Sequence, residues 1–217
     1  MERNKMKHYK SIIFDLDGVI CHTDHYHYLA WKMLADELGI QFHEQMNHLL
    51  RGVSRLESLE IILQHNQKQV ASEEKQSLLT KKNELYVEFL EQLNPADLSQ
   101  DVLNTLYALR DKGIRLAIGS SSRNANYILA QLGITYLFEV VSSGENITKS
   151  KPDPQVFQYA ADRLGLTPQE CLVVEDAQAG IDAAYRGGFD SAGIGDIKSY
   201  ERVTYALETF GDLLKYV

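Results

Sequence analysis

Short apolar runs recur along the chain, and most neighbours are separated by enough residues for a helix. Within each run the apolar residues follow one another instead of alternating with polar ones. Such continuity is typical of strands in a parallel sheet that is covered on both faces. The predicted strands are Ser11–Leu16, Arg115–Gly119, Glu139–Val141, Cys171–Val174 and Ser191–Ile194.

Helical patterns separate most of these runs, as expected for β-α-β units. In three of them the apolar spacing stops at a glycine, which is a common helix end. These helices are predicted over Asp101–Lys112, Asn124–Leu132 and Pro154–Leu164. Another helix begins near Ala177 and ends before Gly187, and Thr167 to Glu170 has the composition of a capped helix start. The sequence therefore predicts an α/β fold with a Rossmann-like parallel sheet.

One stretch breaks this alternation, because residues 22–93 contain no convincing strand. Ser54 and Glu57 form a capping-box pattern at the start of one of its helices. The expected helices are Tyr26–Leu38, Ser54–Gln64 and Ser72–Leu93. We therefore expect an all-helical cap domain over residues 22–95, inserted into a core domain made of residues 1–21 and 96–217.

The composition is compatible with a core domain and a cap domain, and it limits the kinds of molecule that the protein is expected to bind. The chain has 217 residues, of which 44% are hydrophobic, so it is long enough for a core domain and a small second one. Its net charge of −8 disfavours binding to nucleic acid and to anionic membranes. No apolar run approaches the roughly 20 residues of a membrane span. A phosphorylated small molecule would need a local group of Lys, Arg and backbone N–H donors.

The two cysteines, Cys21 and Cys171, are expected at opposite ends of parallel strands and so are not expected to pair. Unpaired thiols suit the reducing cytoplasm. The basic segment from Met1 to Lys10 precedes too short an apolar run for a signal peptide. Whether Met1 or Met6 is the start is left open by the sequence.

The strongest chemical motif is Asp15-Leu16-Asp17-Gly18, directly after the first apolar run. Two carboxylates two residues apart at a strand end point the same way. One can attack phosphorus while the other carries the proton of the attacking or leaving oxygen. Gly18 permits a sharp turn and a close approach to a ligand. In isolation the same motif also fits a solvated turn.

A second acidic pair, Glu175-Asp176, ends another predicted strand. Carboxylates that converge on one edge of the sheet repel one another unless a cation joins them. Hard oxygen ligands and a phosphate substrate suit Mg²⁺. A charged loop before a helix N-terminus explains either pair alone, but explains two converging pairs less well.

Two further motifs follow the remaining central strands. Lys151, within Lys151-Pro152-Asp153-Pro154, can neutralise a phosphoryl oxygen in the same cleft, although such a lysine is commonly a surface residue. Serine hydroxyls and backbone N–H groups at a strand-to-helix turn bind phosphate oxygens well, although loop serines are common. That turn comprises Ser120, Ser121, Ser122, Arg123 and Asn124.

These four motifs, in this order at four strand ends, resemble the haloacid dehalogenase-like superfamily from about Lys10 to Gly195. The resemblance implies that Asp15 is the nucleophile that becomes an aspartyl phosphate and that Asp17 is the general acid/base. Ser120 and Lys151 would hold the transferred phosphoryl group. Dehalogenases of the superfamily lack the second aspartate, so Asp17 argues against dehalogenation. Mg²⁺ would be held by Asp15, Asp17 (through its carbonyl), Glu175 and Asp176.

The helical insertion is most similar to that of the β-phosphoglucomutase branch. Thr23, His27 and Trp31 match the branch, as do Arg51 to Leu59. The resemblance implies that Arg55 holds the phosphate that is not transferred, although a solvated helix arginine remains an alternative. Ser54 is explained equally well as a helix cap. Other contacts to substrate would come from Gly52, Ser54, Ser121, Ser122, Arg123 and Asn124.

By the same resemblance, Thr23 and His27 belong to the catalytic machinery. His27 would contact Asp17 or the hinge and keep the acid/base away until substrate closes the cap. A zinc site at His22, His25 and His27 is the less favoured alternative, because the spacing fits no usual structural site. Trp31 and the cap tyrosines are expected to pack the cap.

The sequence departs from the branch at two places. Cys21-His22 replaces a common Thr-Asp pair, and Thr80 stands where a basic residue is expected. Lys81 and Lys82 are therefore assigned no role as ligands.

The expected function is that of a β-phosphoglucomutase acting on a phosphorylated sugar, with Mg²⁺ and β-glucose 1,6-bisphosphate as intermediate. The alternatives are a Mg²⁺-dependent sugar-phosphate phosphatase and a non-catalytic phospho-ligand binder. The protein is expected to be cytoplasmic and monomeric.

Overall fold

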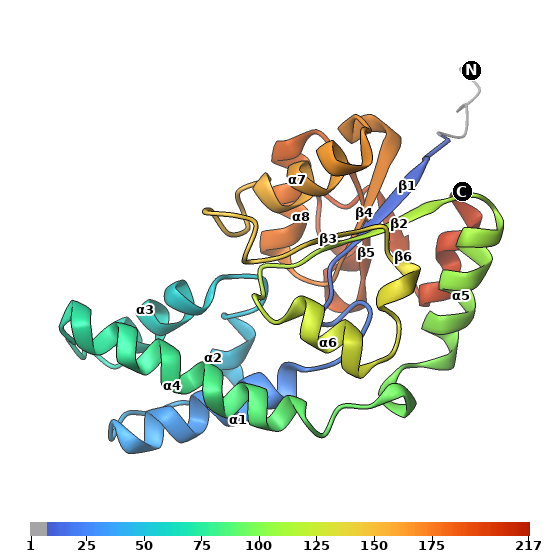
Figure 1. Cartoon of the computed structure of the whole chain (residues 1–217). Helices are drawn as coiled ribbons and strands as arrows, with labels where there is room; N and C mark the ends of the chain where they lie inside the picture. Colours follow the sequence, from blue (N-terminus) through green and yellow to red (C-terminus); the bar gives the residue numbers. More distant parts are fainter. Residues whose placement is uncertain (1–7) are drawn as a thin grey trace.

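The computed structural model describes residues 8–217, so the question of Met1 or Met6 lies outside the described residues. A parallel sheet forms its centre (Figure 1). Its strand order is β3-β2-β1-β4-β5-β6, and each neighbouring pair is parallel. The strands are β1 Ser11–Phe14, β2 Arg115–Gly119, β3 Val140–Ser142, β4 Cys171–Glu175, β5 Asp190–Ile194 and β6 Tyr205–Leu207. The predicted α/β fold with a parallel sheet is confirmed.

The five predicted strands all occur, but the edge strand β6 is missing from the prediction. It contains only three residues, and its central residue, Ala206, is exposed. A run this short carries no periodicity that separates it from a loop. Its hydrogen bonds to β5 come from tertiary contact between Ala192 and Tyr205 and between their successors.

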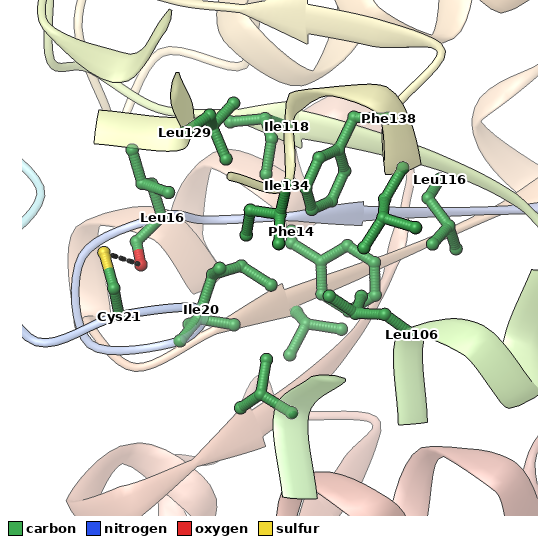
Figure 2. Close-up of a cluster of buried hydrophobic side chains, with 14 of the residues drawn as sticks. Phe14, Leu16, Ile20, Cys21, Leu106, Leu116, Ile118, Leu129, Ile134 and Phe138 are labelled. Carbon is green, nitrogen blue, oxygen red and sulfur yellow. Dashed lines mark hydrogen bonds between the residues drawn. The ribbon is translucent and has the colours of Figure 1, made fainter. Parts of the chain in front are cut away.

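Apolar clusters lie on both faces of the sheet, which explains the continuous apolar runs. On one face, Phe14 and Ile118 pack with helices α5 (Gln100–Asp111) and α6 (Ala125–Gln131) and with η5 (Phe210–Lys215) (Figure 2). On the other face, Ile13 and Ala117 pack with α7 (Gln155–Leu164) and α8 (Gln178–Gly187). Every residue of β1 is buried. Strand β1 is therefore a rigid base for the loop that follows it.

Of the five α-helices between β1 and β2 in sequence, the first four form a lobe beside the sheet (Figure 1). They are α1 (Asp24–Glu37), α2 (Glu44–His48), α3 (Arg55–His65) and α4 (Ser72–Leu90), here called the helical insertion. Trp31, Leu34, Leu59 and Ile62 form an apolar cluster within it. Three of these helices match predictions, whereas α2 was not predicted, since its five residues include one buried side chain, Met46.

Short 3₁₀ turns complete the chain at Pro95–Asp97, Thr135–Leu137, Pro168–Glu170 and Gly195–Ser199. The predicted helix start at Thr167 is therefore a single capped turn that leads into β4. Cys21 and Cys171 are buried and unpaired, as predicted. Among the described residues, no helix combines the length and apolar character needed to cross a membrane.

Candidate functional site

The four predicted motifs meet at the carboxyl edge of the sheet. The order of strands reverses around β1, which pairs with β2 on one side and with β4 on the other. Ligands of open α/β sheets bind in the crevice at such a reversal. Asp15 and Asp17 follow β1, Ser120 follows β2, and Glu175 ends β4.

Asp15 lies where β1 leaves the sheet, 7% exposed, and its backbone N–H donates to the carbonyl of Val174 at 2.9 Å. The turn behind it requires a glycine, because Gly18 has a φ of +90°. A Cβ atom at Gly18 would lie 2.1 Å from Oδ2 of Asp176. The glycine therefore allows the two acidic segments to approach each other.

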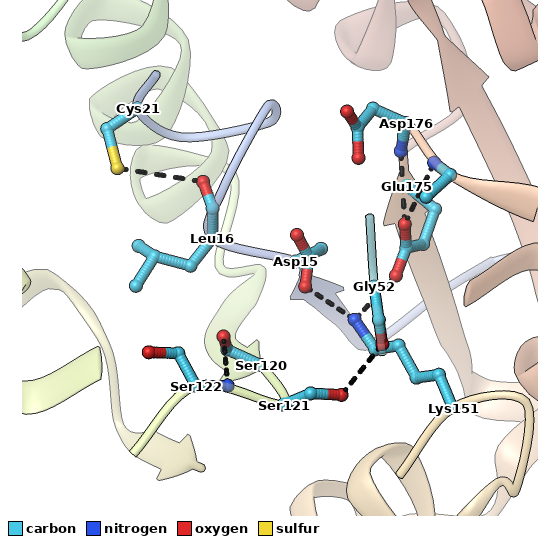
Figure 3. Close-up of polar contacts among 11 residues, drawn as sticks. Asp15, Leu16, Cys21, Gly52, Ser120, Ser121, Ser122, Lys151, Glu175 and Asp176 are labelled. Carbon is cyan, nitrogen blue, oxygen red and sulfur yellow. Dashed lines mark hydrogen bonds and ion pairs between the residues drawn. The ribbon is translucent and has the colours of Figure 1, made fainter. Parts of the chain in front are cut away.

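Lys151 joins the two acidic segments (Figure 3). Its Nζ lies 2.5 Å from Oδ1 of Asp15 and 2.6 Å from Oε1 of Glu175, and its side chain is fully buried. Burial alone lowers the pKa of an ammonium, but the carboxylates of Asp15 and Glu175 outweigh it and raise the pKa of Lys151. Lys151 is thus a fixed positive charge beside the candidate nucleophile.

The side chains of Asp15, Glu175 and Asp176 form a potential metal site. Each offers a carboxylate oxygen, and these oxygens lie within 4.8 Å of one another. Burial raises the pKa of Glu175 to about 7, and burial together with the charge of Glu175 raises the pKa of Asp176 to about 8. Lys151 offsets only part of the effect of burial and of the three neighbouring carboxylates, so the cluster can take up a further positive charge. An all-oxygen set of this kind fits Mg²⁺.

Asp17 has hydroxyl partners and a raised pKa. The Thr23 hydroxyl donates a hydrogen bond to Oδ1 of Asp17 and also lies 2.9 Å from the Tyr86 hydroxyl. Burial, followed by the charges of Asp15 and Asp24, raises the pKa of Asp17 well above its usual range. A carboxyl group held in this way can carry a proton near neutral pH.

The loop after β2 carries the predicted phosphate ligands. Ser120 is buried, and its Oγ accepts a hydrogen bond from the N–H of Ser122 at 3.1 Å. The hydroxyl of Ser121 donates to the carbonyl of Gly52 in the helical insertion at 3.1 Å (Figure 3). Oγ of Ser122 accepts from the N–H of Asn124 at 3.2 Å. These bonds give the loop one conformation and attach it to the insertion.

Arg55 lies on the first turn of α3, which Ser54 caps with the predicted capping box. Its guanidinium donates to Oδ1 of Asn83 at 2.6 Å and to the carbonyl of Leu79 at 3.4 Å. Burial and the nearby charge of Arg123 lower the pKa of Arg55. No carboxylate is among these partners, so the positive charge of Arg55 stays available to an anion.

A cavity of about 370 Å³ lies between the sheet edge and the helical insertion. Residues from both sides line it, including Asp15, Asp17, Asp176, Arg55, Trp31 and Arg123. The other predicted residues on the wall are Gly52, Ser54, Ser120, Ser121, Ser122, Asn124 and His27. Thr23, Lys151 and Glu175 lie behind it, in contact with residues of the wall or with one another. The structure thus gathers every predicted site residue around one cavity.

Lys82 is buried at this cavity, although the sequence analysis assigned it no role. Its Nζ lies 2.7 Å from Nδ1 of His27 and 4.5 Å from the ring centre of Tyr86. Burial and the charge of Arg55 lower the pKa of Lys82. A signal was present in the sequence, because Leu79, Lys82 and Tyr86 are spaced three and four residues apart on one helix face.

His27 was expected to contact Asp17 or the hinge, but its hydrogen bond goes to Lys82 and its ring stacks on Tyr86 at 3.9 Å. Thr23 makes the contact with Asp17 instead. His22 and His25 are exposed, and the cluster of potential metal ligands found in residues 8–217 contains no histidine. The zinc alternative therefore has no support. Trp31 is buried within the insertion, as expected, with an edge on the cavity.

The structure also contains an ion pair beside the cavity that the sequence pattern did not predict. Arg51 Nη2 lies 2.7 Å from Oδ2 of Asp24, which joins the loop before α3 to the first residue of α1. Its two residues are far apart in sequence, and nothing in the local pattern of either one predicts their contact.

Comparisons with known proteins agree with this geometry. A beta-phosphoglucomutase of Bacillus subtilis strain 168 is 41% identical over 188 residues, which cover 86% of this chain and 83% of that protein. The fructose-1-phosphate phosphatase YqaB of Escherichia coli K12 is 31% identical, over 86% and 96% of the two chains. A crystal structure of beta-phosphoglucomutase from Clostridium difficile superposes with a TM-score of 0.90 at 33% identity, over 94% and 93% of the two chains.

The family model of haloacid dehalogenase-like hydrolases matches residues 9–188, which include all four motifs at the sheet edge. On the strength of that match, the chain belongs to the haloacid dehalogenase-like hydrolase family.

Proposed function

We propose that the protein is a β-phosphoglucomutase that interconverts β-glucose 1-phosphate and glucose 6-phosphate. One observation carries this proposal: residues that suit phosphate binding line a single cavity from two sides, the sheet edge and the helical insertion. On the sheet side Asp15 and Ser120 line the cavity, with Lys151 behind Asp15, while Arg55 from the insertion and the nearby Arg123 add positive charge to the same wall. A bisphosphate intermediate needs two such sets of residues, whereas a simple phosphatase needs one.

Asp15 acts as the nucleophile and carries the phosphoryl group as an aspartyl phosphate. In the first half-reaction, Asp17 takes the proton of the 6-hydroxyl while that oxygen attacks the phosphorus on Asp15, which gives β-glucose 1,6-bisphosphate. The bisphosphate then reverses its orientation, within the site or by release and rebinding, so that its other phosphate lies beside Asp15. The carboxylate of Asp15 attacks the phosphorus of the phosphate at C1. Asp17 then returns its proton to the leaving oxygen. Its raised pKa suits it to hold that proton.

Asp15, Glu175 and Asp176 would hold Mg²⁺ through carboxylate oxygens, together with the carbonyl of Asp17. The ion supplies positive charge to the transferring phosphoryl oxygens. Lys151 and Ser120 support the same oxygens from the protein side, and Lys151 stays charged because both of its carboxylate neighbours raise its pKa.

Residues 22–95 act as a cap domain that closes over the sugar, while residues 1–21 and 96–217 form the catalytic core. The bond from Ser121 to Gly52 joins the two in this conformation. Closure excludes the water that would hydrolyse the aspartyl phosphate. Thr23, His27 and Lys82 lie where the cap meets Asp17, and they serve to position the acid/base.

A sugar-phosphate phosphatase is the second candidate, because the fructose-1-phosphate phosphatase YqaB of Escherichia coli aligns over 96% of its length. Both activities use the same core motifs. A non-catalytic binder is less favoured, since Asp15 and Asp17 are both present and in contact with the groups that would activate them.

A steady-state assay separates the three candidates. The protein is incubated with Mg²⁺, β-glucose 1-phosphate and a trace of the 1,6-bisphosphate, and glucose 6-phosphate and free phosphate are followed together. The mutase produces glucose 6-phosphate faster than phosphate. Phosphate release that outruns isomerisation would favour the phosphatase, and no turnover would favour the binder.

A further inference from the structure

Asn83 lies on α4, in the helical insertion, and joins two residues of the cavity wall, Arg55 and Asn124. Its Oδ1 accepts a hydrogen bond of 2.6 Å from Arg55 and one of 2.9 Å from Nδ2 of Asn124. Arg55 belongs to α3 of the insertion, whereas Asn124 belongs to the loop after β2. A single amide oxygen therefore connects three segments across the junction.

The orientation of this amide follows from chemistry alone. A guanidinium has only donors, so the atom of Asn83 that faces Arg55 is the oxygen. The same oxygen then requires a donor from Asn124, which fixes the amide of Asn124 as well. The carbonyl of Leu79, one turn earlier on α4, accepts a second bond from Arg55 at 3.4 Å. Helix α4 thus holds the guanidinium at two points.

The neutral side chain of Asn83 also matters for charge. Arg55 is repelled by Arg123 on one side and by Lys82 on the other, and burial with the charge of Arg123 lowers the pKa of Arg55. A carboxylate at this position would neutralise Arg55. An amide oxygen holds the guanidinium in place while leaving its positive charge for an incoming anion.

We propose that Asn83 is a positioning residue that orients Arg55 and Asn124 toward the phosphate that is not transferred. It would thereby set the preference of the enzyme for sugar phosphates that carry a second phosphate. This inference rests on the proposed function, because it takes the part of the cavity wall around Arg55 and Asn124 as the second phosphate site. Asn83 itself is absent from the cavity wall, so it acts through its two neighbours.

The test compares a donor with two phosphates and a donor with one. Phosphate release is measured in Mg²⁺ with β-glucose 1,6-bisphosphate and with acetyl phosphate, and the ratio of the two kcat/KM values is taken. Acetyl phosphate fills only the transfer site, whereas the bisphosphate also fills the second phosphate site. The ratio therefore measures what the second site contributes to phosphoryl transfer onto Asp15, and this holds whether the phosphoenzyme later reacts with water or with a sugar.

Asn83→Ala should lower this ratio about tenfold while kcat/KM for acetyl phosphate stays within about twofold, as expected from two lost hydrogen bonds near charge. Asn83→Asp keeps the shape and both acceptor bonds, so it should fold even if the alanine variant does not. It should lower the ratio as well, because its carboxylate neutralises Arg55. Glu84→Ala, at the next, exposed residue of α4, is the matched control and should change nothing.

The two proposals can fail separately. A wild-type ratio well above one that stays unchanged in both Asn83 variants would overturn the role of Asn83 alone. A wild-type ratio near one would remove the second phosphate site, and the mutase proposal with it. In an Arg55→Ala background, Asn83→Ala should have a smaller effect than in the wild type. Fully additive losses would show that Asn83 does not act through Arg55.

Discussion

The hydroxyl of Ser121 donates a hydrogen bond of 3.1 Å to the carbonyl of Gly52, which joins the phosphate loop of the sheet to the helical insertion. Gly52 also packs against α8, since a Cβ atom on it would lie 3.5 Å from the Cβ atoms of Ala177 and Ala179. Ala177 directly follows the acidic pair at the end of β4, and Ala179 lies two residues further along the chain. The close fit of Gly52 therefore links the position of the insertion to the segment that carries the acidic pair.

Gly52→Val should reduce turnover at least about tenfold. Gly52 has a φ of +76°, which costs a residue with a side chain on the order of 1–2 kcal/mol, and the added methyl groups would meet Ala177 and Ala179. Gly39→Val is a matched control, because Gly39 has a φ of +65° and nothing within 4 Å of an added Cβ. Both variants should lose similar stability in thermal unfolding. Equal losses of turnover would contradict a role for Gly52 in closure.

Asp15→Asn should abolish both isomerisation and phosphate release, with a loss of at least about 10³-fold, because no other group can take the phosphoryl group at that position. The fold should survive, since Lys151 keeps its bond to Glu175 at 2.6 Å. Circular dichroism checks the fold, and the two product assays check the activity. Residual turnover near the wild-type level would refute Asp15 as the nucleophile.

Arg55→Ala should slow isomerisation much more than slow phosphate loss from the phosphoenzyme. The guanidinium donates to Asn83 and Leu79 of the insertion, whereas Lys151 binds Asp15 and Glu175, so removal of the guanidinium takes no contact from the transfer site. The measurement is the ratio of glucose 6-phosphate to free phosphate formed. The proposed role of Arg55 would be wrong if both rates fell by the same factor.

The acidic site should make stability depend on pH in the absence of metal. The folded protein raises the pKa of Glu175 to about 7 and that of Asp176 to about 8, well above the values near 4 of unfolded chains. Between these values the folded state binds more protons than the unfolded state. The contribution of these two groups to the free energy of unfolding should therefore be largest below about pH 4 to 5. It should fall as pH rises toward about 8, by up to about 1.4 kcal/mol per pH unit for each extra proton that the folded state binds.

Mg²⁺ should reverse this trend, because it binds the deprotonated carboxylates and so stabilises the folded state more at higher pH. Thermal unfolding with chelator and with Mg²⁺, between about pH 5.5 and pH 8.5, measures both effects. The raised pKa of Asp17 acts in the same direction and the lowered pKa of His27 in the opposite one, so the comparison with and without Mg²⁺ is the readout; Glu170 and Asp212, with pKa values lowered to about 2, stay ionised in this window. A Mg²⁺ effect that does not grow with pH would contradict a metal held by Glu175 and Asp176.

Much of the fold follows from local sequence. Buried strands such as β1 have continuous apolar residues, and their loops carry the acidic motifs, so the sheet edge and its chemistry were predictable. The edge strand β6 and helix α2 were not, because three and five residues are too short to show a period. Their presence depends on packing against the rest of the chain.

The residues of the site also fall into two groups, those that the sequence motifs predicted and those that only the tertiary structure shows. Asp15, Lys151 and Glu175 belong to motifs, and the sequence assigned them to one site. Lys82 and Asn83 belong to an amphipathic helix whose polar residues usually face water, and only the tertiary structure shows that they face His27 and Arg55. Helical spacing indicated the face of Lys82, but no local pattern indicates its partner.

The fate of the phosphoenzyme tests the mutase proposal most directly. Protein labelled on Asp15 with phosphorus from β-glucose 1,6-bisphosphate is chased with β-glucose 1-phosphate in Mg²⁺, and the label is followed into sugar bisphosphate and into free phosphate. The mutase proposal, with a cap that closes over a substrate whose phosphate binds at Arg55, predicts that most of the label moves to the sugar. Label that passes mainly to water, at a rate that the sugar phosphate leaves unchanged, would contradict the mutase and identify the protein as a phosphatase.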